Sequence, residues 1–264
     1  MKASLNYQAL KNGQPVSDAL VVEVPVQLFI EGEPLTVSMC TPTHIREWAF
    51  GILFTEGIIR SAEQVLSYSE EEVDHQITLR VALSNAANAV TNKRSLLSVS
   101  ACGICGKTAF EPATRSDDER SSMTLSDDRD ADDEQSSMTL REGMAKMMVQ
   151  LRGVQTLFEE TGGCHAAGVF NKNQELLFAS EDIGRHNAVD KVVGSLVIHQ
   201  QLREAKYLMV SGRVSYEIVA KCFAAGIPNL AAVSSPSSLA VDYAKELGIA
   251  LFAFCRENRV TQYA

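Results

Sequence analysis

From residue 162 to the end of the chain, short apolar runs typical of β-strands alternate with amphipathic runs typical of α-helices. Strands are predicted at 166–170, 175–180, 207–210, 230–233 and 249–254. Helices are predicted at 141–160, 186–201, 214–225 and 236–247. Because strands joined through a helix usually lie parallel in one sheet, this order predicts a substantially parallel, twisted sheet with helices on both faces. Residues 141–264 are therefore expected to form one α/β domain.

The first part of the chain has a different pattern. A β-hairpin is predicted from the β-rich runs at 20–30 and 35–39, which flank a Glu-Gly-Glu-Pro turn. A helix is expected to start after a Thr43 cap, and residues 76–83 alternate as a further strand. These elements predict a smaller α+β domain over residues 1–95.

Residues 96–140 separate the two domains and have a strongly biased sequence. The pentapeptide Ser-Ser-Met-Thr-Leu occurs at 121–125 and again at 136–140. Residues 116–140 hold nine acids against two arginines, a net charge of −7 within a chain total of −9. Such a polar segment is expected to be a solvated, mobile insert, and the alternative is an acidic tether that docks a basic partner beside the cysteines described below.

Composition argues against several classes of function. The chain lacks a basic stripe and has few aromatic residues, so nucleic-acid binding is not expected. No apolar run approaches the length of a membrane span, about 18 residues, and the N-terminal residues lack the apolar core of a secretory signal. The six cysteines are spread without a disulfide-rich pattern, which favours a reducing cytoplasm.

Two cysteines, Cys102 and Cys105, follow a run of small residues and precede Lys107. Gly103 and Gly106 give the backbone freedom to turn, and the lysine charge favours the thiolate, which is the nucleophilic form of the thiol. The chain has no second pair at the spacing of a structural zinc site, and no strong strand precedes the pair as in thioredoxin-type proteins. Spacing alone still leaves zinc binding, redox exchange and carriage of a persulfide on a mobile loop open.

Four strands of the predicted C-terminal sheet end in polar junctions, at 181–187, 211–213, 234–238 and 254–259. If the strands are parallel, all four junctions leave the same edge, where such sheets bind ligands. Single junctions of this kind are also ordinary turns and helix caps. Together they offer cationic and polar side chains at helix N-termini, which favour anions. These side chains are Arg185, His186, Arg213, Arg256 and Arg259.

The edge therefore predicts a site for a phosphate- or pyrophosphate-bearing molecule. Neither G-x-G-x-x-G nor a Walker A sequence is present, which argues against a standard NAD or ATP site.

The run Thr-Gly-Gly-Cys-His-Ala-Ala-Gly at 161–168 is weighed against zinc deaminases, which use H-x-E followed by P-C-x-x-C. Here Ala167 stands where that glutamate would be, and the C-x-x-C pair lies upstream of His165. The deaminase chemistry is therefore missing even if the fold is shared. Cys164 is either a reactive thiol or a small buried filler beside two glycines.

Five motifs resemble those of the FdhD family, the formate dehydrogenase accessory sulfurtransferases. They are Ser-Ala-Cys-Gly-Ile-Cys-Gly at 100–106, Thr-Gly-Gly-Cys-His-Ala-Ala at 161–167, Glu-Asp-Ile-Gly-Arg-His-Asn-Ala-Val-Asp-Lys at 181–191, Ser-Gly-Arg-Val-Ser-Tyr-Glu at 211–217 and Phe-Cys-Arg at 254–256. The resemblance spans nearly the whole chain, and the acidic repeat at 116–140 is the departure from it. It implies a three-layer, cytidine-deaminase-like C-terminal domain beside the smaller N-terminal α+β domain.

The resemblance also implies a function. Members of this family take sulfur from a cysteine desulfurase and pass it to the bis-molybdopterin guanine dinucleotide cofactor, which then enters formate dehydrogenase. On this chain the resemblance places the persulfide on Cys102, with Cys105 as partner or relay. The expected cofactor contacts, including those from the strand-end junctions, are Phe254, Cys255, Arg256, Glu257, Asn258, Arg259, Arg213 and His186.

The expected protein is thus a cytoplasmic sulfurtransferase that holds the cofactor as cargo, with no structural metal and with a homodimer as its assembly. Two alternatives stay open: a non-catalytic chaperone that binds and delivers the molybdenum cofactor, and a small zinc-binding interaction module. The sequence is symmetric about the cysteine pair, so it does not show which sulfur is loaded first.

Overall fold

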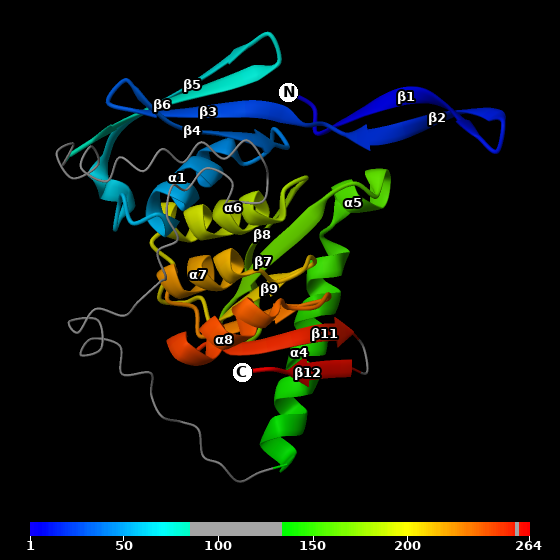
Figure 1. Cartoon of the computed structure of the whole chain (residues 1–264), viewed down its shortest axis with the longest axis vertical. Coiled ribbons are helices and arrows are strands. Elements are labelled where there is room, and N and C mark those ends of the chain that lie inside the picture. The colour runs from blue at the N-terminus through cyan, green and yellow to red at the C-terminus, as the bar shows by residue number, and fades with distance from the viewer. Residues whose placement is uncertain (85–133, 257–258) are drawn as a thin grey trace.

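The computed structural model describes residues 1–84, 134–256 and 259–264, which form three β-sheets flanked by helices (Figure 1). Four residues of the predicted site lie outside the described residues: Cys102, Cys105, Glu257 and Asn258. Among the described helices, none is long and apolar enough to cross a membrane.

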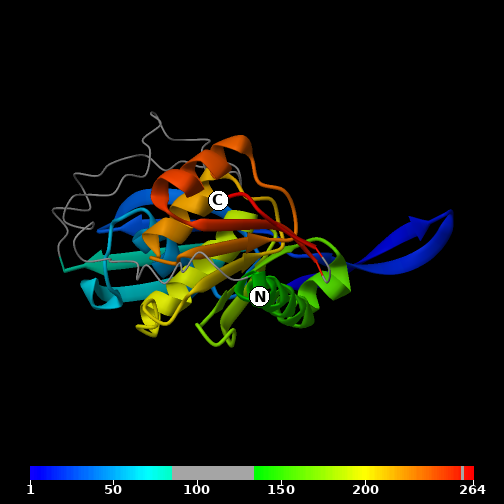
Figure 2. The same ribbon diagram turned by 90° about the horizontal axis from the view of Figure 1, so that it is seen from below.

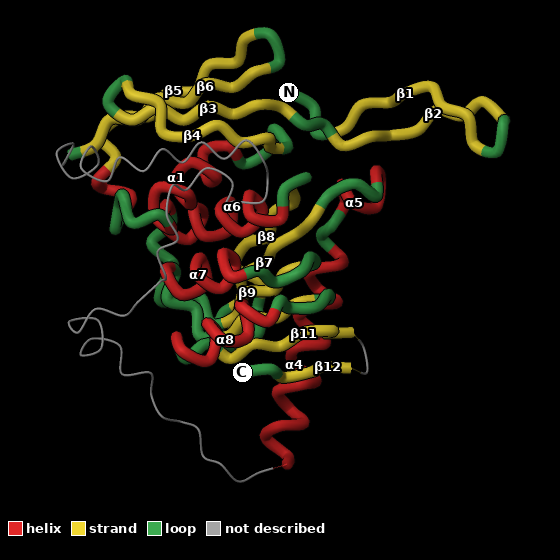
Figure 3. Tube along the Cα trace, viewed as in Figure 1, coloured by secondary structure: helices red, strands yellow, loops and turns green. Residues whose placement is uncertain are grey.

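The N-terminal half contains two separate sheets. Strands β1 (Ser4–Lys11) and β2 (Gln14–Val21) pair only with each other and project from the rest of the chain (Figures 1 and 2). The second sheet, whose strands are drawn in yellow at the top of Figure 3, has the order β4-β3-β6-β5. Its strands are β3 (Val24–Ile30), β4 (Glu33–Cys40), β5 (Val65–Val73) and β6 (Gln76–Leu83).

The predicted hairpin is confirmed as β3–β4, and the predicted strand at 76–83 is confirmed as β6. The predicted first strand of the hairpin started too early, because the apolar run from residue 20 is split between the end of β2 and the start of β3. Strands β1 and β5 were not predicted, since nearly all of their side chains are exposed or half-buried and they lack a periodic apolar face.

The C-terminal half is built on a six-stranded sheet with the order β12-β11-β10-β9-β7-β8. Its strands are β7 (His165–Phe170), β8 (Leu176–Asp182), β9 (Tyr207–Val210), β10 (Asn229–Ala232), β11 (Ala250–Arg256) and β12 (Arg259–Gln262). Only β9, β10 and β11 are parallel neighbours, whereas β7 is antiparallel to both β8 and β9, and β12 is antiparallel to β11. The prediction of a substantially parallel sheet was wrong at both edges, because short connections permit only antiparallel neighbours there.

Helices cover both faces of this sheet, as predicted (Figure 2). Helices α6 (Arg185–Ile198), α7 (Tyr216–Ala224) and α8 (Ser238–Leu247) lie on one face, and α4 (Glu134–Gly153) lies on the other. Alternate side chains of β7 reach the two sides: Ala167 and Val169 pack with α6, whereas Ala166 and Phe170 pack with α4. The chain therefore forms a mixed α/β fold with a layered C-terminal half.

The predicted helix at 141–160 is two helices. Helix α4 begins at residue 134, inside the predicted acidic insert, and α5 (Thr156–Thr161) follows after a short break. The methionine stripe of α4 is core, as expected, since Met144 and Met147 are fully buried against the sheet. The sequence did not mark the true start of α4 because residues 134–140 are mostly polar and have no apolar period.

Helix α1 (Ile45–Thr55) packs closely against α6 and joins the N-terminal sheet to the C-terminal half. Its N-cap is His44, in the left-handed region at φ 50°, and not the predicted Thr43. The two helices approach at Gly51 and Gly194, where a Cβ atom would collide with the backbone oxygens of Asp190 and Glu47 respectively. The two halves share one continuous apolar core through this contact.

The helix contact gives a stability prediction. Gly194→Ala places a methyl group against the Glu47 carbonyl of α1, so the helices must separate, and we expect the free energy of unfolding to fall by about 3 kcal/mol. Urea unfolding measures the change. The matched control is Gly153→Ala at the end of α4, where an added Cβ meets nothing, so no loss is expected. Equal losses in the two variants would contradict the role given to the glycine contact.

Candidate functional site

The four predicted junctions leave the same edge of the six-stranded sheet. Strands β8, β9, β10 and β11 all run in one direction, and β7, which runs the other way, starts at that edge. We call this edge the carboxyl rim, and it comprises residues 164–165, 181–187, 211–215, 234–238, 254–256 and 259. Its position agrees with the usual place of ligand sites in such sheets.

Backbone hydrogen bonds join neighbouring junctions of the carboxyl rim. The Val214 amide donates to the Ser235 carbonyl at 3.1 Å, and the Ser237 amide donates to the Val214 carbonyl at 2.9 Å. The Phe254 amide donates to the Ser234 carbonyl at 3.4 Å. The loops after β9, β10 and β11 are therefore held together as one surface.

His165 lies at the centre of this edge, where β7 begins. Its neighbour Ala166 donates its amide to the Ser211 hydroxyl at 2.8 Å, which fixes the start of β7 beside the loop after β9. A Cβ atom on Gly212 would lie 3.3 Å from His165 Nδ1, so the glycine gives the ring its space. Burial, followed by the charges of Arg185 and Arg213, lowers the pKa of His165.

His165 is thus a neutral ring at pH 7 within a cationic setting. The sequence analysis named Arg185 among the cationic side chains of the strand-end junctions, but it did not select His165 as a site residue. The signal for His165 was its place directly after the Gly-Gly-Cys run, but only the antiparallel pairing of β7 brings it to the rim.

Two of the predicted cofactor contacts, Arg213 and His186, differ in exposure. Arg213 is exposed at the rim. His186 is buried in the first turn of α6, and its Nε2 atom lies 3.0 Å from the Ser215 hydroxyl and 3.2 Å from the Glu217 carboxylate. The His186 side chain therefore joins the starts of α6 and α7 beneath the rim.

The end of β11 and the start of β12 form the last part of the rim. Phe254 has a left-handed backbone at φ 54°, where the pairing of β11 with β12 shifts register. The Arg259 guanidinium lies over the Phe254 ring at 4.8 Å from its centroid, and Arg256 is exposed. Cys255 instead points to the α4 face and is fully buried there, so its thiol does not reach the rim surface.

The motif at 181–191 contributes mainly a buried polar network. The Lys191 ammonium lies 2.6 Å from the Asp182 carboxylate, and both side chains are fully buried. Lys191 also donates to the Thr41 carbonyl at 2.9 Å, while the Thr41 amide donates to Asp182 at 3.0 Å. The same Asp182 accepts the Gly184 amide at 2.7 Å, which shapes the turn of the first junction.

Other members of the motif bind the N-terminal half in the same way. Asn187 donates to the Met39 carbonyl at 2.8 Å and accepts from the Trp48 indole at 3.2 Å. Asp190 accepts from the Lys221 ammonium at 2.7 Å and from the Thr55 hydroxyl at 3.0 Å. These contacts tie β4, α1 and α7 to α6 and leave few groups of the motif to meet a ligand.

The cysteines of the described residues are all buried: Cys40, Cys164, Cys222 and Cys255. Cys164 donates to the Glu181 carboxylate at 3.3 Å, and burial together with this carboxylate raises its pKa to about 12. Burial also raises the pKa of Cys255 to about 11 and that of Cys40 and Cys222 well above the ordinary value. None of these four thiols is poised to act as a nucleophile at neutral pH.

The described part of the chain holds no group of three or more His, Cys, Asp or Glu side chains placed to bind a metal ion.

The first prediction from this site concerns protonation. The His165 ring should titrate below its ordinary pKa of 6.5, and Arg213→Gln should raise that pKa because it removes a nearby positive charge. Because the folded-state pKa of His165 is lower than its unfolded-state pKa, the ring contributes to folding stability at pH values above the unfolded-state pKa. This contribution is lost as the pH falls through the folded-state pKa. NMR titration of the imidazole resonances measures the His165 pKa in the wild type and in Arg213→Gln. Arg80→Gln on β6 is the control and should leave this pKa unchanged. A His165 pKa at or above 6.5 in the wild type would contradict the geometry.

The second prediction concerns the thiols. In a variant with Cys102→Ser and Cys105→Ser, the remaining four thiols should resist iodoacetamide at pH 7 in the folded protein, because burial holds them protonated and covered. Mass spectrometry should find four modifications once the chain is unfolded in denaturant. Rapid labelling of Cys164 in the folded protein would show that it is accessible and reactive.

Comparison with known proteins gives relatives of nearly full length. The chain is 40% identical over 267 residues to the sulfur carrier protein FdhD of Mycolicibacterium paratuberculosis, which covers 96% of this chain and 93% of the relative. It is 35% identical over 251 residues to the sulfur carrier protein FdhD of the archaeon Saccharolobus solfataricus, with coverage of 94% and 89%.

A solved structure shares the fold. A protein from Desulfotalea psychrophila superposes with a TM-score of 0.68 at 22% identity, covering 99% of this chain and 96% of the other. A sequence model of the FdhD/NarQ family matches residues 21–264, which include every junction of the carboxyl rim. On these grounds the chain belongs to the FdhD/NarQ family.

Proposed function

We propose that this protein is a sulfur carrier that serves formate dehydrogenase maturation. It would accept sulfur from a cysteine desulfurase on Cys102, with Cys105 as partner or relay, and pass it to the bis-molybdopterin guanine dinucleotide cofactor. The near-full-length similarity to proteins named sulfur carrier protein FdhD is the main support for this role.

The thiols supply a second line of support. The four described cysteines are buried and held in the thiol form, so they are poor sulfur acceptors. The remaining two cysteines of the six are Cys102 and Cys105, outside the described residues. Sulfur carriage on this chain is therefore best assigned to that pair.

The loading step is a thiolate–persulfide exchange. The Cys102 thiolate attacks the outer sulfur of the desulfurase persulfide, a new S–S bond forms, and the old S–S bond breaks to release the desulfurase cysteine as a thiolate. The outer sulfur is then held as a persulfide on Cys102. No external oxidant or reductant is consumed.

The carboxyl rim is the proposed seat of the cofactor. Its exposed arginines, Arg213, Arg256 and Arg259, suit the phosphates of the guanine dinucleotide, since a guanidinium can bind two phosphate oxygens at once. His186 would act by positioning the starts of α6 and α7, and Cys255 could contribute only through its backbone. Glu257 and Asn258 stay predicted contacts.

The finer statements about fold and assembly are also proposals. The sheet order and the helices on both faces support a cytidine-deaminase-like C-terminal half in which Ala167 replaces the proton-shuttling glutamate. A cytoplasmic homodimer is proposed from the family resemblance.

A non-catalytic chaperone is the second candidate, because the arginines of the rim could bind the cofactor without any part played by the cysteines. One experiment distinguishes the sulfur carrier from the chaperone. Wild type, Cys102→Ala, Cys105→Ala and the control Cys164→Ala are each incubated with cysteine desulfurase and cysteine, and each is tested for activation of formate dehydrogenase.

The carrier predicts that the 102–105 peptide of wild type and Cys164→Ala gains the mass of one sulfur atom, and that Cys102→Ala loses both this adduct and activation. The chaperone predicts that activation survives both Cys102→Ala and Cys105→Ala. Failure of every protein to gain the adduct, with labelled sulfur still reaching the cofactor, would rule out the carrier.

A further inference from the structure

Three side chains of the carboxyl rim meet beside the backbone of Gly212, in the loop after β9. A Cβ atom on Gly212 would lie 3.3 Å from His165 Nδ1, at the start of β7, and 3.5 Å from Arg185 Cβ, in the first turn of α6. Arg213 follows Gly212 directly. The charges of Arg185 and Arg213 both reach the His165 ring, since they lower its pKa. We call His165, Arg185, Gly212 and Arg213 the Gly212 cluster.

No acidic side chain balances the two arginines of this cluster. Among the described residues, no ion pair includes Arg185 or Arg213. The carboxylate that acts on His165 is that of Asp182, but it is fully buried and paired with Lys191 at 2.6 Å. Two like charges held close together repel each other, and an anion placed between them would remove that repulsion.

The imidazole of His165 is also without a protein partner. His44, His186 and His199 each form a hydrogen bond through a ring nitrogen. In the part of the chain that the structure describes, neither nitrogen of the half-buried His165 ring does so. Since the ring is neutral at pH 7, it offers one N–H donor and one acceptor nitrogen to a ligand at the rim.

These groups fit the oxygens of a phosphate. A guanidinium presents parallel N–H donors that match two phosphate oxygens, and an imidazole N–H can donate to a third. The cluster is also apart from Arg256 on β11, because β10 lies between β11 and β9 and two strand spacings are about 10 Å. It is therefore a second position for an anion along the same rim.

We propose that the Gly212 cluster is a phosphate subsite of the carboxyl rim, in which Arg185 and Arg213 bind the phosphate oxygens and His165 donates a hydrogen bond to the same group. The inference rests on the proposed function for the identity of the cargo, and it adds Arg185 and His165 to the groups that hold it. A side chain in place of Gly212 would crowd the ring and close this subsite.

The subsite couples binding of the anion to protonation of His165. Three charged groups act on the ring: Arg185 from α6 and Arg213 from the loop after β9 lower its pKa, and Asp182 at the end of β8 raises it. A bound phosphate offsets the two arginines, so the pKa of His165 rises and the ring takes up a proton. By linkage, the anion then binds more tightly as the pH falls.

Calorimetry on the full-length protein tests the subsite with symmetrical dimethyl pyrophosphate, whose two negative charges do not change between pH 5 and 8. Binding is expected, with an affinity about tenfold higher at pH 5 than at pH 8. Arg185→Gln should weaken binding about tenfold at pH 7. The matched control is Arg203→Gln, which removes an exposed arginine at the opposite edge of the sheet and should leave the affinity unchanged. His165→Gln keeps a donor but should abolish the pH dependence.

NMR of the wild type tests the geometry without any substitution. Saturation with symmetrical dimethyl pyrophosphate should shift the imidazole resonances of His165 and raise its pKa. Succinate, a dicarboxylate of the same charge, should do so less at the same concentration. Guanosine diphosphate and methyl diphosphate identify the source of the phosphate: tighter binding of guanosine diphosphate would indicate a nucleotide, and equal binding a phosphate on another kind of molecule.

No binding of symmetrical dimethyl pyrophosphate, a His165 pKa unchanged on saturation, or equal losses of affinity in Arg185→Gln and Arg203→Gln would overturn the subsite. The sulfur adduct on the 102–105 peptide is measured without the cofactor, so it does not depend on this outcome. Loss of the adduct alone would overturn the carrier and leave the subsite standing.

Discussion

The buried ion pair between Lys191 and Asp182 is the interaction on which the rest of this structure depends. Both groups are fully buried, and each also bonds the backbone of Thr41 in the N-terminal half. Removing one partner of such a pair typically costs about 3–5 kcal/mol, because the other charge stays buried without compensation. The pair therefore fixes the N-terminal half against α6, and through the Gly184 amide it also sets the first turn of the carboxyl rim.

This dependence changes how the motif at 181–191 is understood. A run so rich in charged and polar residues resembles a ligand site. Four of its side chains are nevertheless buried and form their hydrogen bonds with other groups of the protein: Asp182, Asn187, Asp190 and Lys191. The contacts of the motif hold α6 in place, and Arg185 and His165 lie close together at the rim beside it.

The sequence predicted elements well where burial alternates with a clear period, as in the strands at 76–83 and 207–210, and poorly where it does not. Strand β1 is almost wholly exposed, and β12 has no buried side chain that would give a periodic apolar face. For the site, strand order was enough to bring the four junctions to one edge. The burial of Cys255 depends on how α4 packs against the sheet, which no local pattern records.

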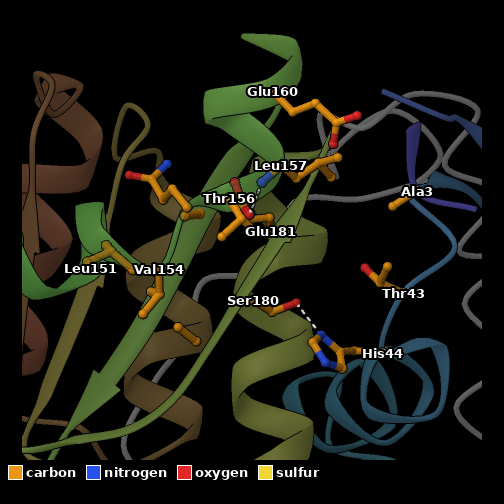
Figure 4. A pocket seen from close by; sticks show the side chains of 13 residues that line it. Ala3, Thr43, His44, Leu151, Val154, Thr156, Leu157, Glu160, Ser180 and Glu181 are labelled. Carbon is orange, nitrogen blue, oxygen red and sulfur yellow. Dashed lines mark hydrogen bonds between the residues drawn. The ribbon is translucent and has the colours of Figure 1, made fainter. Parts of the chain in front are cut away.

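Adjacent residues of β7 face opposite sides of the sheet, and the two sides differ in charge. His165 faces the arginines after β8 and β9. Ala166 lines a cavity of about 310 Å³ between the end of α4, α5 and the segment before α1, and Glu160 and Glu181 also line it (Figure 4). Opposite charges attract more strongly as water is excluded between them. Because the cationic rim and the acidic cavity lie on opposite faces of the sheet, their charges are kept apart and do not neutralise each other.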